Sequence, residues 1–185
     1  MASFRHLTTA ELESRLEHVL GSPTDNGKLE LIVRRPEVDQ RESVTAGRLD
    51  PEQGLVGDTW RRRGGDMADG SADPEVQITV MNSRVAALVA DDDDRRELAG
   101  DQLYLDLDLS GANLPAGTQL AIGSAIIEVT EQPHTGCRKF ADRFGKDATV
   151  FVNSGLGRKQ NFRGINARVI QSGDLKVGDV AQKLS

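Results

Sequence analysis

The chain has 185 residues, a formal net charge of −6 and a calculated isoelectric point near 5.1. This length suits one domain with a full core, since two independent domains would each be unusually small. The acidic balance argues against a sequence-independent nucleic-acid binder, which needs a basic surface to displace counterions. One cysteine forms no internal disulfide, and neither a signal peptide nor an apolar run long enough to span a bilayer is visible. We therefore expect a cytoplasmic protein that contacts neither nucleic acid nor membrane.

The N-terminal segment has the pattern of an amphipathic helix. An apolar stripe runs from Leu7 to Leu20, and Thr8 and Glu11 have the spacing of a capping box. We expect residues 1–27 to form a helical extension of the main domain, which then occupies residues 28–185.

Strands and a long loop follow this extension. Alternation predicts a first strand from Leu29 to Arg35, with Leu29, Leu31 and Val33 on one face. A second short strand is expected at residues 43–48. Residues 50–73 are rich in Gly, Asp and Arg with little apolar periodicity, which indicates a long loop that is either functional or mobile.

The middle of the chain alternates between strand and helix patterns. Residues 76–81 read as a strand, and Asn82 or Ser83 caps a helix that continues through Val89. The acidic run at residues 91–94 lacks the glycine and glutamate of an EF-hand loop, so we interpret it as a solvated loop. Strict alternation at residues 103–109 predicts a half-buried strand.

The C-terminal part of the sequence contains further short elements. We expect two strands joined by a tight turn, two short helices and a closing hairpin, at residues 118–123, 125–131, 137–144, 147–153, 165–171 and 179–183. Many short strands with few helices, and no regular strand-helix alternation, argue against a doubly wound parallel sheet. The sequence therefore predicts a mostly β, barrel-like α+β fold with a few short helices.

The single cysteine, Cys137, follows the turn His134-Thr135-Gly136 and precedes a helix pattern. A helix N-terminus and the neighbouring Arg138 and Lys139 favour the thiolate, which is the form that acts as a nucleophile and as a ligand for soft metals. The alternative is an inert buried thiol, because free cysteines are commonly small core residues.

Several ordered motifs together resemble a MOSC domain, the domain named for the C-terminal part of molybdenum cofactor sulfurases. They are Gly54-Leu55-Val56-Gly57-Asp58, residues 77–82, Gly100-Asp101, Thr135-Gly136-Cys137, residues 163–168 and Gly178-Asp179. The resemblance covers residues 29–184 and suggests a small stand-alone member. It implies a barrel-like fold that in several members binds the molybdenum cofactor (molybdopterin), with a cysteine that contacts the metal or carries sulfur.

Candidate cofactor-binding residues lie in the loops. A molybdopterin phosphate needs cations or backbone donors, and bidentate arginine contacts suit it. The candidates are Arg61, Arg62, Arg63, Gly64 with Gly65, Arg138, Arg158, Arg163 and Asn166. Solvated surface charge is the alternative for individual members such as Arg62 and Lys159. With Cys137 as the metal ligand, we expect residues 57–58, 61–65, 137 and 163–166 to share one pocket.

Two further residues join Cys137 as catalytic candidates. Asp58 either caps a turn or stands near the metal as an outer ligand or proton carrier. His134, three residues before Cys137, either supports the thiolate or shuttles protons from a second layer around the metal. Trp60 is either a packing anchor or part of a pocket wall.

The resemblance leaves two classes of function open. In the first, the chain is a molybdenum-dependent oxidoreductase that acts on N-oxygenated small molecules and takes electrons from a partner reductase. In the second, Cys137 holds a persulfide supplied by a cysteine desulfurase, or the cofactor, for delivery elsewhere. A domain that has lost the cofactor is a third interpretation. Pyridoxal phosphate belongs to the desulfurase module of the sulfurases, and we do not expect it in this domain.

Overall fold

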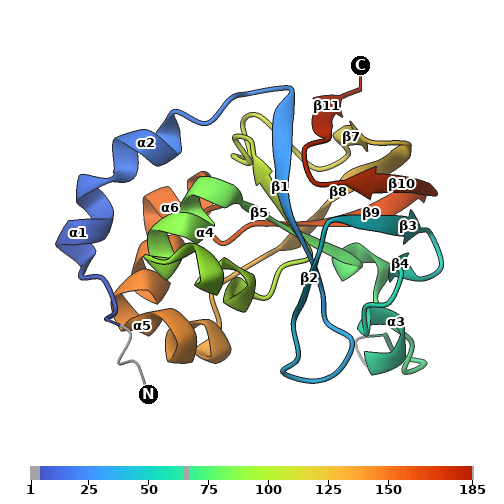
Figure 1. Cartoon of the computed structure of the whole chain (residues 1–185), viewed down its shortest axis with the longest axis horizontal. Helices are drawn as coiled ribbons and strands as arrows, with labels where there is room; N and C mark the ends of the chain where they lie inside the picture. The colour runs from blue at the N-terminus through green and yellow to red at the C-terminus, as the bar shows by residue number, and fades with distance from the viewer. Residues whose placement is uncertain (1–4, 65–66, 185) are drawn as a thin grey trace.

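The computed structural model describes residues 5–64 and 67–184, and its centre is a closed β-barrel (Figure 1). The barrel strands are β1 (Gly27–Arg34), β5 (Ile78–Asn82), β6 (Leu103–Asp106), β7 (Gln119–Ile122), β8 (Ala125–Pro133), β9 (Ile165–Gln171) and β11 (Val180–Lys183). They follow the order β11-β7-β8-β9-β5-β6-β1, and pairing of β11 with β1 closes the ring. The expected barrel-like α+β fold is therefore confirmed.

One pair of neighbouring strands in the barrel, β5 and β6, is parallel, and the other neighbours are antiparallel. A parallel pair needs a crossover connection. Here the connection consists of the helix α4 (Ser83–Ala90) and the 3₁₀-helix η2 (Asp93–Ala99). The chain thus reaches β6 from a helical layer outside the barrel.

Smaller elements extend the barrel. The strand β2 (Glu42–Val44) adds to β1, and a second sheet has the order β10-β3-β4. Its strands are β3 (Ala46–Asp50), β4 (Gly54–Leu55) and β10 (Gly173–Lys176). The short helix α3 (Trp60–Arg63) and the 3₁₀-helix η1 (Pro74–Val76) occupy part of the expected long loop.

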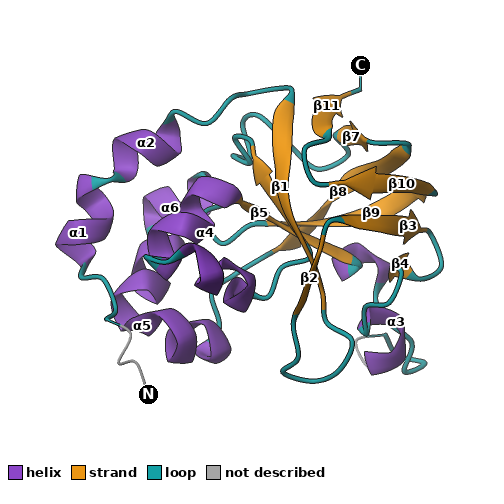
Figure 2. Ribbon diagram, in the orientation of Figure 1, coloured by secondary structure: helices purple, strands orange, loops and turns teal. Residues whose placement is uncertain are grey.

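The remaining helices gather on one side of the barrel (Figure 2). They are α1 (Thr9–Ser14), α2 (Leu16–Leu20), α5 (Arg138–Asn153) and α6 (Gly155–Lys159), which join α4 there. A second apolar cluster, including Leu12, Phe140 and Phe144, fills the space between these helices and the barrel. In the part of the chain that the structure describes, no helix combines the length and apolar character needed to cross a bilayer.

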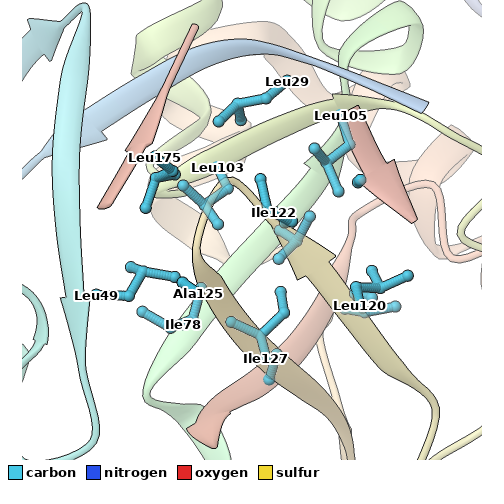
Figure 3. Close-up of a cluster of buried hydrophobic side chains, with 14 of the residues drawn as sticks. Leu29, Leu49, Ile78, Leu103, Leu105, Leu120, Ile122, Ala125, Ile127 and Leu175 are labelled. Atoms are coloured by element: carbon cyan, nitrogen blue, oxygen red, sulfur yellow. The ribbon is translucent and has the colours of Figure 1, made fainter. Parts of the chain in front are cut away.

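The barrel interior is a separate apolar core (Figure 3). It combines side chains from strands of both sheets, among them Leu29, Leu49, Ile78, Leu103, Leu105, Leu120, Ile122, Ala125, Ile127 and Leu175. Full burial of a leucine or isoleucine side chain contributes about 1.5–3 kcal/mol, so this core is a main source of stability.

Local sequence signals predict several elements correctly. Thr8 and Glu11 form the expected capping box, although Arg15 separates α1 from α2. The two expected helices after Cys137 form one segment that is interrupted at Gly145, whose φ of 90° is not helical. Asn82 caps α4 through hydrogen bonds from the backbone of Arg84 and Val85.

Three expectations are wrong. No closing hairpin forms, because β9 pairs with β5 and β8 whereas β11 pairs with β1 and β7. The strand at 103–106 is not half-buried, because the helical layer also covers its outer face and Tyr104 is fully buried. A register shift between Leu29 and Leu31 breaks the alternation of β1, so Ile32 points into the barrel core instead of Leu31.

The turn between β7 and β8 generates a prediction about stability. Gly123 has a φ of 59°, and a Cβ there would lie 2.3 Å from the carbonyl oxygen of Asp174. Gly117, just before β7, has a φ of 87° but open space around its Cβ position. We expect Gly117→Ala to lower the free energy of unfolding by about 1 kcal/mol through backbone strain, and Gly123→Ala by at least about twice as much. Urea denaturation of both variants measures this, and equal losses would contradict the steric argument.

Candidate functional site

Two adjoining pockets open at one end of the barrel. The first, which we call the tryptophan pocket, has a volume of about 400 Å³ and is lined by Arg35, Trp60, Arg63, Gly64, Ala72, Val76, Thr79, Pro133, His134, Thr135 and Asn166. The second, which we call the cationic pocket, has a volume of about 210 Å³. The two pockets share Arg35, Arg63, Thr79 and His134, so they form one continuous cleft.

The cationic pocket concentrates positive charge in an otherwise acidic chain. Six of its lining residues are cations, namely Arg35, Arg41, Arg63, Lys139, Arg143 and Arg163. Among the described residues, two carboxylates, Glu37 and Asp39 of the β1–β2 loop, line the same pocket. Asp39 lies 3.6 Å from Arg143 and 3.7 Å from Lys139, and all three side chains are partly or largely exposed. The pocket therefore keeps an excess of positive charge.

The turn at residues 98–101 anchors three of these arginines. Consecutive backbone carbonyls accept their hydrogen bonds: Leu98 from Arg143 at 2.9 Å, Ala99 from Arg163 at 3.0 Å and Gly100 from Arg35 at 3.1 Å. These carbonyls end η2, where the unpaired carbonyl groups of a helix favour cations. The left-handed conformation of Gly100, with a φ of 89°, closes the turn.

Asp58 fixes Arg35 from behind the cleft. Its buried carboxylate accepts two hydrogen bonds from the guanidinium, each 2.8 Å, in a bidentate pair. It also accepts from the backbone N–H groups of Arg35 and Trp60. Asp58 lines neither pocket, so it holds an arginine and a turn in place rather than facing the cleft.

Asp101 fixes Arg163 in the same way. Arg163 Nη1 donates to Asp101 Oδ2 at 2.6 Å, and the guanidinium lies 5.1 Å from the ring centre of Phe140. Asp101 Oδ1 faces His134 Nδ1 at 3.3 Å. Both carboxylate pairs are strongly shielded from water, so they hold the guanidinium groups in fixed orientations.

Arg41 makes no salt bridge with a described residue, although the charge of Asp39 acts favourably on it. Its Nε atom is buried without a hydrogen-bond partner, and its Nη1 donates to the carbonyl of Gln40 at 2.7 Å. Burial lowers the pKa of Arg41, and repulsion from Arg143 and Arg35 lowers it further. An anion bound beside Arg41 would oppose both effects.

Cys137 is exposed and lies where the cationic pocket meets the start of α5. It occupies the N-cap position, with a φ of −108° and a ψ of 179°, but its side chain makes no capping hydrogen bond. The thiol is therefore available to a ligand in the pocket. The inert buried thiol is ruled out.

His134 lines both pockets and is largely buried. Burial lowers its pKa to about 4, the charges of Arg163 and Arg35 act in the same direction, and Asp101 opposes them. The imidazole is therefore neutral near pH 7. This makes it a hydrogen-bonding group rather than a positive charge in the cleft.

The structure brings together some of the predicted site residues and separates others. Cys137, His134, Arg63, Gly64, Arg163 and Asn166 line the cleft. The side chains of the remaining candidates lie elsewhere among the described residues. Arg61 donates to the carbonyl of Glu52, Arg62 to Pro36 and Arg158 to Asn153, whereas Arg138 is exposed at the start of α5 outside both pockets. Gly65 lies outside the described residues.

Sequence reasoning missed several residues of the cleft. Arg35, Arg41 and Arg143 were not candidates, and Asp101 appeared only as part of a family motif. Arg35 directly follows β1 and precedes Pro36, so its place at a strand end was a usable signal. Arg143 lies within a helix, and its direction depends on how α5 packs against η2.

Comparison with known proteins identifies the family. The fold is a closed barrel with a helical layer on one side, and the family model of the MOSC domain matches residues 74–182. The chain belongs to the MOSC domain family. Among curated proteins, none matches the chain in sequence.

Solved structures show the same fold. The YuaD protein from Bacillus subtilis (APC1665) has a TM-score of 0.63 and 18% identity, and the match covers 85% of this chain and 94% of that one. YiiM from Escherichia coli has a TM-score of 0.55 and 20% identity, with 85% and 70% covered. A crystallised hypothetical protein has a TM-score of 0.56 and 22% identity, with 85% and 69% covered. At these identities the similarity concerns the fold alone.

The buried Asp58–Arg35 pair generates a stability prediction. Asp58→Asn replaces a charged acceptor by a neutral amide and leaves the buried guanidinium without its counter-charge. We expect a loss of about 3 kcal/mol in the free energy of unfolding, measured by urea denaturation. The matched control is Asp174→Asn, which breaks the exposed pair with Arg48 and should cost less than about 1 kcal/mol. Similar losses in both variants would show that burial of the Asp58–Arg35 pair is unimportant.

The crowding of Arg41 predicts opposite effects on folding and on anion binding. Arg41→Gln removes a repelled charge, so the protein without added anion should have an equal or higher thermal midpoint. It should also bind inorganic phosphate roughly tenfold more weakly, because a charge-assisted hydrogen bond is lost. Calorimetric titration and thermal unfolding with and without phosphate measure both effects. Arg48→Gln, an exposed arginine on β3, is the control and should bind phosphate like the wild type.

Proposed function

We propose that this MOSC protein binds the molybdenum cofactor in the cleft and acts as an oxidoreductase on N-oxygenated small molecules, with Cys137 as the metal ligand. The observation that carries the proposal is the position of the single cysteine. Its exposed thiol lies at a pocket that six cations line. A soft ligand and an anion site thus adjoin each other.

The residues of the cleft fit the two ends of the cofactor. A phosphate requires cationic donors, and Arg41, Arg143 and Arg163 supply them in the cationic pocket. The metal prefers a soft ligand, which the Cys137 thiolate provides. When bound, the cofactor supplies two-electron redox chemistry at the metal.

The tryptophan pocket is the proposed place for the substrate. Trp60 forms a buried wall, and its Nε1 is already occupied by a hydrogen bond of 3.1 Å to the carbonyl of Asp73. Asn166 donates its amide hydrogen to the carbonyl of Gln132, which leaves its own carbonyl oxygen as an acceptor. The pocket thus combines an apolar wall with a few fixed polar groups, as small-molecule sites commonly do.

The overall reaction needs a reductant. Removal of the oxygen from an N-oxygenated compound consumes two electrons and two protons and releases water. A partner reductase is the proposed source of the electrons. The role of the chain is to bind and orient the substrate beside Cys137 and to exclude water from the buried part of the cleft.

One observation favours a second function. Cys137 is exposed, so a cysteine desulfurase has access to it. In this alternative, the Cys137 thiolate attacks the outer sulfur of the desulfurase persulfide. A new S–S bond forms on Cys137 while the desulfurase thiolate leaves.

The proposal predicts the behaviour of Cys137→Ser expressed in a host that makes the molybdenum cofactor. Serine remains protonated near neutral pH, so bound molybdenum and turnover of a hydroxylamine with a reductase should both fall at least about tenfold. Serine is a favoured N-cap residue, so the thermal midpoint should be unchanged or higher. Metal analysis, activity assays and thermal unfolding of both proteins measure these effects.

Controls separate the outcomes of this experiment. Ala112→Ser introduces a serine at an exposed turn outside both pockets and should retain molybdenum and activity. A wild-type protein that lacks molybdenum but gains the mass of one sulfur atom on Cys137 would favour the carrier function. Full molybdenum and full activity in Cys137→Ser would refute the role of Cys137 in both functions.

A further inference from the structure

Two buried polar atoms face each other beside the cleft without a partner. Within the described residues, Asp101 Oδ1 and His134 Nδ1 are both buried and neither makes a hydrogen bond with good geometry. They lie 3.3 Å apart. The other oxygen of Asp101 accepts from Arg163 at 2.6 Å, so the carboxylate cannot turn away without losing that pair.

The chemistry of the two atoms fixes where the imidazole proton lies. A carboxylate oxygen only accepts hydrogen bonds, so the facing nitrogen must carry the hydrogen if either atom is to be satisfied. The opposite tautomer would place two lone pairs against each other in a buried site, where unpaired acceptors are strongly unfavourable. We infer that Asp101 is a positioning residue that holds His134 in its Nδ1–H tautomer and leaves Nε2 as a hydrogen-bond acceptor in the cleft.

The surroundings of His134 keep it neutral. Burial lowers the pKa of His134 to about 4, and Arg163 and Arg35, which both donate to the turn at residues 98–101, repel a second proton on the ring. Nε2 is not among the buried unpaired atoms, and no described residue hydrogen-bonds to it. The ring lines both pockets, so Nε2 is the nitrogen that a ligand can reach.

An acceptor at this point gives the cleft selectivity that its arginines lack. Guanidinium and ammonium groups only donate hydrogen bonds, so they recognise the acceptor groups of a ligand. His134 Nε2 recognises an N–H or O–H group instead, where the cationic pocket meets the tryptophan pocket. The role of this acceptor in turnover rests on the proposed function, whereas the tautomer is a property of the protein alone.

Asp101→Asn tests the inference because Arg163 dictates how the new amide is oriented. Arg163 Nη1 only donates, so the asparagine oxygen should remain on Arg163 and the amide NH₂ should face His134. That group donates to Nδ1 and forces the hydrogen onto Nε2. Nitrogen NMR of histidine-labelled, cofactor-free protein distinguishes protonated from unprotonated ring nitrogens, and His134→Gln assigns the His134 signals among the three histidines.

We expect Nε2 to be the unprotonated nitrogen in the wild type and Nδ1 in Asp101→Asn. Tyr104→Phe, which removes a buried hydroxyl near Asp101 and leaves the carboxylate in place, is the control and should keep the wild-type tautomer. A wild type with unprotonated Nδ1 would overturn the inference even if Asp101→Asn failed to fold. A folded Asp101→Asn that kept the wild-type tautomer would also overturn it.

The same variant separates this inference from the proposed function. In protein loaded with cofactor, Asp101→Asn should retain bound molybdenum but lose at least about tenfold in turnover. Unchanged turnover with the reversed tautomer would overturn the role of Nε2 as a ligand acceptor. Absence of molybdenum from the wild type would instead count against the proposed function, while the NMR result on cofactor-free protein would still decide the tautomer.

Discussion

The cleft depends on the turn at residues 98–101, which brings the guanidinium groups of three arginines together in one pocket. Its three carbonyls and the Asp101 carboxylate receive Arg143, Arg163 and Arg35. Hydrogen bonds from cations to carbonyl groups are favourable without neutralising the cations. The carbonyls therefore fix the orientation of the arginines, while Asp58 and Asp101 balance the charges of Arg35 and Arg163. The excess of positive charge in the pocket comes from the further cations that line it.

Barrel topology explains why these groups meet at one end. The strands β1 and β8 end at this rim, where Arg35 and His134 follow them. The strands β6 and β9 begin there, and Asp101 and Arg163 precede them. The parallel crossover through α4 and η2 brings the turn to the same rim, because β6 must start beside the start of β5. Sequence separations of more than 60 residues thus become contacts of about 3 Å between Arg35, Arg163 and the turn.

The sequence predicted what depends on local chemistry. The capping box of α1, the cap of α4 and the break in α5 all follow from a few neighbouring residues. Strand partners depend on long-range pairing, so the hairpin expected at the C-terminus was wrong. The β1 bulge reversed an alternation that the sequence shows plainly. The candidate arginines were predicted from their positions in loops. Whether an arginine points into the cleft depends on partners such as Asp58 and the carbonyl of Gly100. These partners are distant in sequence and come close only in the folded chain.

The choice of residue at the start of α5 supports a role outside stability. Five other helices begin with side-chain caps, from Thr8, Asp73, Asn82, Asp92 and Ser154. The short helices α2 and α3 and the long helix α5 have no such hydrogen bond, and α5 has Cys137 at this position. A serine, threonine, aspartate or asparagine cap contributes about 1 kcal/mol relative to a residue that cannot cap. An exposed cysteine also carries a risk of oxidation. The chain therefore places a less stabilising and more reactive side chain at the start of α5, where it lines the cationic pocket, which suits a site for chemistry better than a packing role.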